Sequence, residues 1–457
     1  MGYAERKQAE VERKMEALAL EFERWLNATA PGGPFPKHHT QVRAAIGRLQ
    51  GFQDAVREIL ATDNSLSTAR EMARTLLAVH RIWEFFRSKL AQRYEKAFAR
   101  YLAIADEFAW LCYHPIYEQA RQANPGRAMK EPPLVYLNGG MSPFILTRDA
   151  SFQAEAVPRE LISGSGFKQA TSSLPFPVIG VPWNQVLHLP DALAIGHEVG
   201  HSVEADFDLE AALDTMIDEA LEESGGAARA PLWKAWRSEV FADVCGCLAA
   251  GPPFVCALAD FLLADPQELL ARQPAVEPYP PENLRVRINV QVLRKMGFEE
   301  PADRILTAWD AEYPLPAGQS CFAEEDAPAI AERFLDGQIE ALGGSLRSAL
   351  TFDATQYERA RTQAQCALEG RVLKDYRDLR VMLAAARIAY ATKPDAYYRP
   401  INGISPAERL EQKMESLLTS DLRSGERART QQQQQKADEE NRKLGKQDFA
   451  RIFQRLQ

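Results

Sequence analysis

The strongest constraint on the fold is the five-residue segment His197–His201, which reads His-Glu-Val-Gly-His. Two imidazoles at this spacing can hold one metal ion if the segment is helical, because one helical turn places them on the same face. Pro190 and Asp191 are helix-start signals just before it. Gly200 carries no side chain, so another element can pack closely there. Glu198 lies beside the imidazole pair, where its carboxylate can hold a metal-bound water.

A catalytic zinc site with one open position needs a third protein ligand. A histidine six residues beyond His201 would fit one known pattern, but that position is Phe207. Glu239 is the better candidate, because it lies in a second predicted helix that runs from about Pro231 to Ala250. Asp243 lies one turn further on the same face, where it can accept a hydrogen bond from a ligand histidine. The alternative is that this helix only turns two acids toward solvent.

The pattern His-Glu-x-x-His on one helix, followed by Glu-x-x-Ala-Asp on a second, resembles the gluzincin metallopeptidases. That superfamily includes thermolysin and the HtpX-like and CAAX-prenyl endopeptidases. The resemblance extends over Leu134–Gly297, where the Pro-rich segment Tyr279–Val286 is similar to a later element of these relatives. It implies a zinc-dependent metallopeptidase, a hydrolase that holds Zn²⁺ through His197, His201 and Glu239.

In this interpretation, zinc lowers the pKa of its bound water toward ~7. Glu198 is then the general base that accepts the proton as the water attacks a peptide carbonyl. Tyr279, Arg285 and His188 are candidates for stabilising the oxyanion. The short strand Val178–Val181 is flanked by prolines, which is typical of an edge strand. Such a strand can pair with an extended peptide.

The remaining sequence predicts a mainly α fold with a small antiparallel β-sheet, an α+β zincin-like core flanked by helices. Leu134–Leu137 and Phe144–Thr147 surround Asn138-Gly139-Gly140, which is a hairpin signal. Apolar residues recur at steps of three and four from Leu76 to Cys112 and predict one long helix there. Gln356–Thr392 is a second long helical candidate.

We expect four regions along the chain. They are a helical N-terminal domain (1–130), a zincin-like catalytic domain (131–300), a helical C-terminal domain (301–423) and a polar, flexible tail (424–457). The tail contains five consecutive glutamines, at 431–435, which indicates low complexity and predicts either disorder or a solvated helix. The N-terminal helices are where a protein partner or a second copy could bind.

Composition limits the classes of function. The formal net charge is −9, and an acidic chain argues against general nucleic-acid binding, which depends on basic patches. The acidic residues concentrate in 131–300, which favours basic substrates by steering or simply keeps the protein soluble. No apolar signal core begins the chain, and no run reaches the ~18–20 apolar residues of a membrane span. The six cysteines follow no regular spacing, so we expect free thiols and a cytoplasmic location.

Two other functions fit the same residues. A non-peptidase zinc amidase or deamidase would use the same metal site on a smaller substrate. A helical scaffold or adaptor protein could keep a structural or relic zinc site. Glu198 argues against the scaffold, because a structural site does not need that acid. The residues leave open which peptide or protein would be the natural substrate.

Overall fold

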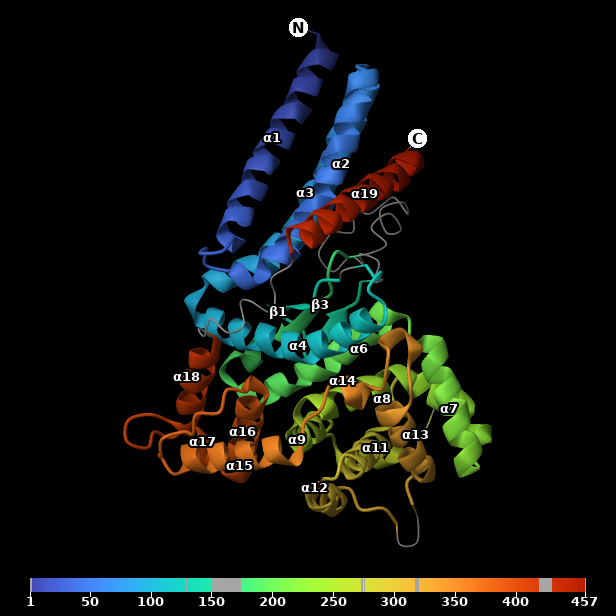
Figure 1. Ribbon diagram of the computed structural model, residues 1–457, viewed down its shortest axis with the longest axis vertical. Coiled ribbons are helices and arrows are strands. Elements are labelled where there is room, and N and C mark those ends of the chain that lie inside the picture. The colour runs from blue at the N-terminus through green and yellow to red at the C-terminus, as the bar shows by residue number, and fades with distance from the viewer. Residues whose placement is uncertain are drawn as a thin grey trace.

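The computed structural model shows an elongated helical bundle above a wider body, with a small sheet where the two meet (Figure 1). Most of the described residues are helical, and three strands form the sheet. This confirms the predicted mainly α fold with a small sheet. The structure describes residues 2–128, 130–148, 174–272, 274, 276–316, 320–418 and 430–456.

The bundle combines the first helices of the chain with the last one. Its members are α1 (Tyr3–Thr29), α2 (His39–Thr62), α3 (Leu66–Ala91) and α19 (Gln431–Leu456). α1 buries Val11, Met15, Leu18 and Phe22, which share one face because they recur at three- and four-residue steps. Phe22 packs edge-on against Trp83 of α3, with 5.2 Å between the ring centroids. The bundle therefore has an apolar core of its own.

Of the two alternatives that the sequence leaves for the tail 424–457, the described residues adopt the helical one. Its residues from Gln431 onward form α19, which packs along α2. A buried ion pair joins the two helices, with 2.9 Å between Arg48 Nε and Asp448 Oδ2. The polar composition of this segment does not predict the packing, because the contact needs only a few suitable residues on one face of α19.

The predicted long helix from Leu76 to Cys112 is two helices in the structure. The chain turns at η2 (Gln92–Tyr94) and continues as α4 (Lys96–Ala123), which leaves the bundle and packs against the body. Arg93 in the turn is buried and donates to Asp106 of α4 at 2.7 Å. Both helices carry apolar residues at the same period, so the spacing alone does not reveal the break.

The sheet contains β1 (Leu134–Asn138), β2 (Phe144–Leu146) and β3 (Val178–Pro182), in the order β1-β3-β2. β3 pairs parallel with β1 and antiparallel with β2, so the sheet is mixed rather than purely antiparallel. The predicted hairpin is wrong, because β3 lies between the two strands that the Asn-Gly-Gly turn connects. The predicted edge position of Val178–Val181 is also wrong. β3 is central and fully buried, and β2 is an edge strand.

The body contains the helices that follow the sheet. In chain order these are η4 (Trp183–Leu187), η5 (Leu189–Ala194), α6 (Ile195–Phe207), α7 (Glu210–Ser224), α8 (Ala230–Ala250), α9 (Pro252–Phe261), α10 (Pro266–Ala271), α11 (Glu282–Lys295), α12 (Glu299–Glu312), α13 (Ala327–Asp336), α14 (Leu346–Ala349), α15 (Ala354–Leu368), α16 (Leu379–Thr392), α17 (Pro394–Tyr397) and α18 (Pro406–Leu418). One cluster of buried apolar residues extends from α4 to α18. The regions predicted as separate domains at 131–300 and 301–423 therefore share a core.

The predicted long helix Gln356–Thr392 is interrupted between α15 and α16. Gly370 follows the end of α15 with φ +68°, a left-handed conformation that ends helices and favours glycine. The chain then turns, and α16 packs against η5 and α9. This return places α16 beside the segment that leads into His197.

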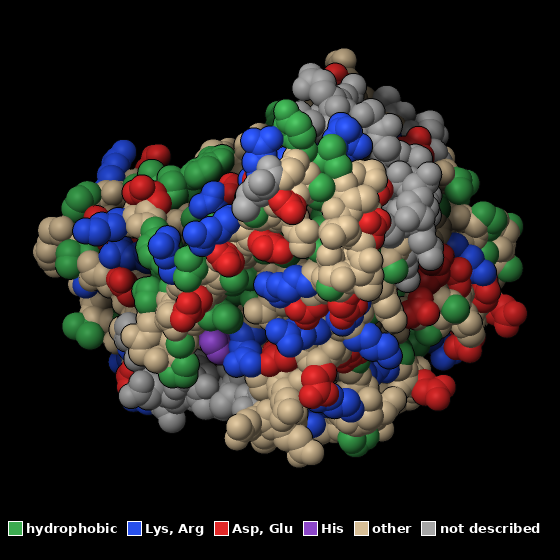
Figure 2. All heavy atoms as spheres, turned by 90° about the horizontal axis from the view of Figure 1, so that it is seen from above, with side chains coloured by type: hydrophobic (Ala, Val, Ile, Leu, Met, Phe, Trp, Pro, Cys, Tyr) green, Lys and Arg blue, Asp and Glu red, His purple; other side chains and the backbone are tan. Residues whose placement is uncertain are grey.

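Charged side chains of both signs are interspersed over the face seen from above, and acidic ones gather at the side where α7 lies (Figure 2). Acids of α7 form ion pairs with neighbouring helices of the body, such as Asp218 with Lys234 of α8 and Glu219 with Arg333 of α13. Among the described residues, no helix is both long enough and apolar enough to cross a membrane.

The glycines between α2 and α19 provide a test of this packing. A Cβ at Gly51 would lie 2.3 Å from the carbonyl oxygen of Arg442, whereas a Cβ at Gly47 would meet nothing closer than 3.4 Å. We expect Gly51→Ala to lower the free energy of unfolding by about 1–3 kcal/mol, although alanine is the better helix former. Gly47→Ala, one turn earlier on the same helix, should be neutral or slightly stabilising. Equal stability of the two variants in chemical denaturation would contradict this packing.

Candidate metal centre

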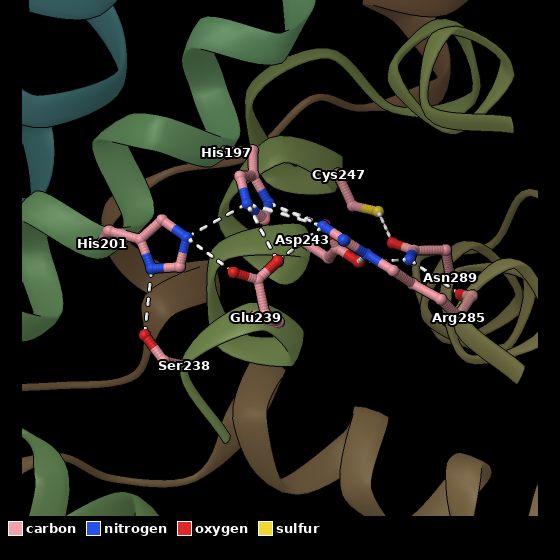
Figure 3. A network of polar contacts seen from close by, with 8 residues as sticks. All are labelled: His197, His201, Ser238, Glu239, Asp243, Cys247, Arg285 and Asn289. Carbon is pink, nitrogen blue, oxygen red and sulfur yellow. Dashed lines mark hydrogen bonds and ion pairs between the residues drawn. The ribbon is translucent and has the colours of Figure 1, made fainter. Parts of the chain in front are cut away.

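The candidate site forms where α6 crosses α8. Gly200 of α6 allows the close approach, because a Cβ there would lie 2.6 Å from the Cα of Ala242 on α8. The crossing turns one face of α6, with His197 and His201, toward the face of α8 that carries Glu239 (Figure 3). The prediction that glycine would let a second element pack here agrees with this geometry.

The three predicted ligands converge on one point. The two Nε2 atoms of His197 and His201 lie 3.1 Å apart. Each also lies 3.4 Å from a carboxylate oxygen of Glu239. Ligand atoms about 2.0–2.1 Å from a tetrahedral zinc ion are separated from one another by roughly 3.3 Å. The two histidines face different oxygens of the carboxylate, and one ligand atom from each of the three residues lies within 4.8 Å of the others, which is compatible with their binding one ion.

The protonation pattern also fits a bound cation. The Nδ1 atoms of His197 and His201 lie 2.7 Å from Asp243 Oδ1 and 2.9 Å from Ser238 Oγ. If both Nδ1 atoms donate, both Nε2 atoms turn lone pairs toward each other and toward the Glu239 carboxylate. A shared proton or a metal ion makes that arrangement favourable, and Arg285 Nη2, 3.5 Å from His197 Nε2, is a further donor beside it.

Asp243 is held in place by two further residues. Arg285 of α11 donates to both of its carboxylate oxygens, at 2.8 Å each, and Asn289 donates to one of them at 2.8 Å. The same arginine lies 3.0 Å from Glu239 Oε2, so it contacts both acids. Asp243 thus orients His197 as predicted, while Arg285 orients Asp243.

A second chain of contacts supports His201, and the sequence analysis missed it. Ser238 accepts from His201 and donates to the Glu204 carboxylate, which also accepts from Arg237 at 3.1 Å. Glu204 lies three residues beyond His201 on the same helix, and this spacing was an available signal. Ser238 carries no comparable signal, since only the crossing of α6 and α8 brings it to the imidazole.

Burial and neighbouring charges set the protonation of the site. Burial lowers the pKa of His197, but hydrogen bonds to Asp243 and Glu239 outweigh it and raise that pKa to about 9 in the metal-free chain. Burial raises the pKa of Glu239, but its two histidine partners outweigh this and lower it well below the usual range. Burial raises the pKa of Glu198, opposed by the nearby histidines. Binding of a cation by this cluster would therefore release a proton from it.

The cluster opens into a cavity of about 780 Å³ that is lined by Glu198 and by edge strand β2. All three predicted oxyanion candidates reach this cavity, but they differ in their contacts. Arg285 is buried and bound to the two acids described above. His188 pairs with Tyr398 and Asp191. Tyr279 is 65% exposed, and the charge of Glu239 raises its pKa. The geometry therefore does not select one of them for the oxyanion.

Comparisons of the chain with family models, with curated proteins and with solved structures give no match. The resemblance to gluzincins therefore rests on the motif residues, and the chemistry of the site on its geometry. That geometry brings together His197, His201 and Glu239 as a group that could hold a metal ion.

Replacing the third ligand tests the metal site directly. We expect Glu239→Gln to abolish stoichiometric zinc binding, because the amide supplies no charge to balance the ion. Glu210→Gln is the matched control, since Glu210 lines the same cavity without joining the ligand group. Metal analysis after dialysis measures both variants. Full zinc content in Glu239→Gln would remove this carboxylate from the ligand set.

Substitutions of Asp243 and Ser238, which contact the two histidines, should lower the affinity for zinc to different extents. Asp243→Asn keeps the shape but weakens the hydrogen bond to His197, so zinc affinity should fall about 10- to 100-fold. Ser238→Ala removes a neutral partner of His201 and should have a smaller effect. Competition with a chelator measures both affinities. A larger loss of zinc affinity in Ser238→Ala would show that the serine contributes more to the site than Asp243 does.

Proposed function

We propose that this protein is a zinc-dependent metallopeptidase, whose active site is the cavity around His197, His201 and Glu239. The observation that supports it most is the combination of a three-ligand group and a buried acid, Glu198, on one open cavity. Structural zinc sites are closed by four protein ligands, whereas catalytic sites keep one position open. Among the described residues the group has three members, which favours the catalytic kind.

Zinc suits this donor set better than harder cations. Two imidazole nitrogens and one carboxylate are ligands that zinc accepts in a tetrahedral arrangement, whereas magnesium and calcium take mainly oxygen. When bound by these residues, zinc would polarise a carbonyl group and make a neighbouring water more acidic. The two hydrogen-bonded supports keep both imidazoles in the tautomer that leaves Nε2 free for the ion.

Glu198 is suited to move the proton. It lies in the helical turn between the two histidines, is 7% exposed and lines the cavity. Its raised pKa makes its carboxylate a better base than an exposed glutamate. In the proposed reaction it accepts a proton from the attacking water and donates it to the leaving amine. Arg285 holds Asp243 and Glu239 during this step and so keeps the first histidine in place.

The position of β2 favours peptides over small amides. β2 is an edge strand, and its residues Phe144 and Ile145 line the cavity. An edge strand offers backbone donors and acceptors that can pair with an extended peptide. This assigns peptide pairing to β2, whereas the sequence assigned it to Val178–Val181. A cavity of about 780 Å³ is also larger than a small amide needs.

The cytoplasm is the proposed location of this activity. All six cysteines are free in the structure, and they show no pairing that would require an oxidising compartment. Cys112 and Cys245 are buried in the apolar core of the body, whereas the Cys247 thiol donates to Asn289 Oδ1 at 3.2 Å, behind Asp243 (Figure 3).

Glu198→Gln separates catalysis from metal binding. We expect the zinc-loaded variant to keep its metal but to lose peptide hydrolysis by about 10²- to 10⁴-fold in kcat, because the amide cannot accept the proton. Glu222→Gln is the control, since Glu222 is an exposed acid of α7 outside the cavity. The assay measures cleavage of a peptide library and of unfolded protein. Wild-type protein that binds zinc but cleaves no better than Glu198→Gln would overturn the proposed function.

A further inference from the structure

The cavity extends well beyond the metal ligands, along the axis of α6. Ala194 just before this helix and Asp208 just after it both line the cavity. At 1.5 Å per residue, these positions are roughly 20 Å apart. An extended peptide rises about 3.3 Å per residue, so roughly six residues span this length. The metal ligands at 197 and 201 lie between the two ends.

The two ends of the cavity differ in chemistry. At the C-terminal end of α6, the lining carries the acids Glu204, Asp208 and Glu210. At the N-terminal end, α9 and α16 pack against η5 and contribute a mostly apolar wall. We call this wall the α9–α16 pocket, and its members are Phe254, Ala257, Leu258, Phe261 and Tyr390. The same two helices also contribute Asp260 and Arg387 to the lining, and these two pair with each other. The apolar members of the wall favour an apolar side chain at this end.

Polar residues that also line the cavity hold the pocket together. Arg387 of α16 is almost fully buried and donates to the Cys256 carbonyl of α9 at 3.0 Å. It also pairs with Asp260 of the same helix. The ring of His188 packs edge-on to Tyr390, with centroids 4.5 Å apart. These contacts join α9, α16 and the segment before α6, so the wall exists before a ligand arrives.

Phe261 leaves part of this wall exposed to solvent. Its side chain is 53% exposed although it lines the cavity beside buried Phe254 and Leu258. A large apolar residue on a concave surface gains free energy when a ligand covers it. The pocket is continuous with the metal site, so the ligand that reaches it is whatever occupies that site.

From these contacts we infer that the α9–α16 pocket binds one large apolar side chain, aromatic or leucine-like, of the peptide substrate near the cleaved bond. The inference rests on the proposed peptidase function and adds the class of residue that the substrate carries. It also assigns a role to α16, which lies outside the segment with the gluzincin resemblance. Phe261 and Tyr390 are specificity-determining residues in this view.

The test measures binding apart from cleavage. Zinc-loaded Glu198→Gln protein is titrated by calorimetry with capped alanine-rich hexapeptides, in which a single phenylalanine is moved from position to position. We expect one position to raise affinity about 10- to 100-fold over the all-alanine peptide, as burial of a large apolar side chain does. Adding Phe261→Ala should remove most of that gain and change the affinity of the all-alanine peptide less than about twofold.

Leu263→Ala supplies the matched control, because Leu263 is 56% exposed, two residues further on, and does not line the cavity. It should leave the phenylalanine preference intact. Equal affinity at all positions, or the same loss in both variants, would overturn the pocket. A positional preference without cleavage by wild-type protein would keep the pocket and reject the peptidase. Cleavage by wild-type protein without any preference for phenylalanine would support the peptidase and reject the pocket.

Discussion

The contact between Gly200 of α6 and Ala242 of α8 is the constraint on which the site depends. No side chain fits between the two backbones there, so the helices meet at a fixed distance. That distance brings a carboxylate of α8 to 3.4 Å from the imidazoles of His197 and His201. The same crossing aligns Asp243 and Ser238 with the two remaining ring nitrogens. One close backbone contact thus determines both the ligand set and its supports.

Burying the charged groups beside this crossing costs free energy, so stability alone does not explain why they are there. Asp243 and Arg285 are almost inaccessible to solvent, and burying an ion pair seldom stabilises a fold more than apolar residues would. Here each charge has several partners, since Arg285 contacts two acids and Asn289 adds a further donor to Asp243. A fully satisfied network of this kind fixes geometry. It contacts His197 directly, so it fixes the geometry of the group that could hold a metal ion.

Local patterns predict local parts of this protein well. The spacing of His197 and His201 predicts the helix and its ligand face, and the segment from Pro231 to Ala250 predicts almost all of α8. Asp243 is placed correctly because its spacing from Glu239 is also local. Local patterns do not predict the sheet order, because β3 reaches its place between β1 and β2 through pairing with distant residues. Proline flanks suggest an edge strand, but they lie at and beyond the ends of β3, where no ladder bond is lost.

Because sequence patterns are local, the residues that would contact a substrate are harder to predict than the candidate metal ligands and the general base. The proposed chemical groups lie on α6, α8 and α11, and the motif residues identify most of them. The cavity walls come from β2, α9 and α16, which the chain brings together from positions 144 to 390. No single spacing links Tyr390 to Phe261, because α16 reaches α9 only after the break at Gly370 and through the contacts of Arg387. In this architecture the proton-transfer groups and the apolar wall are held by separate contacts. If the protein is the proposed peptidase, changes in the wall would therefore alter which peptide binds without moving the three candidate ligands.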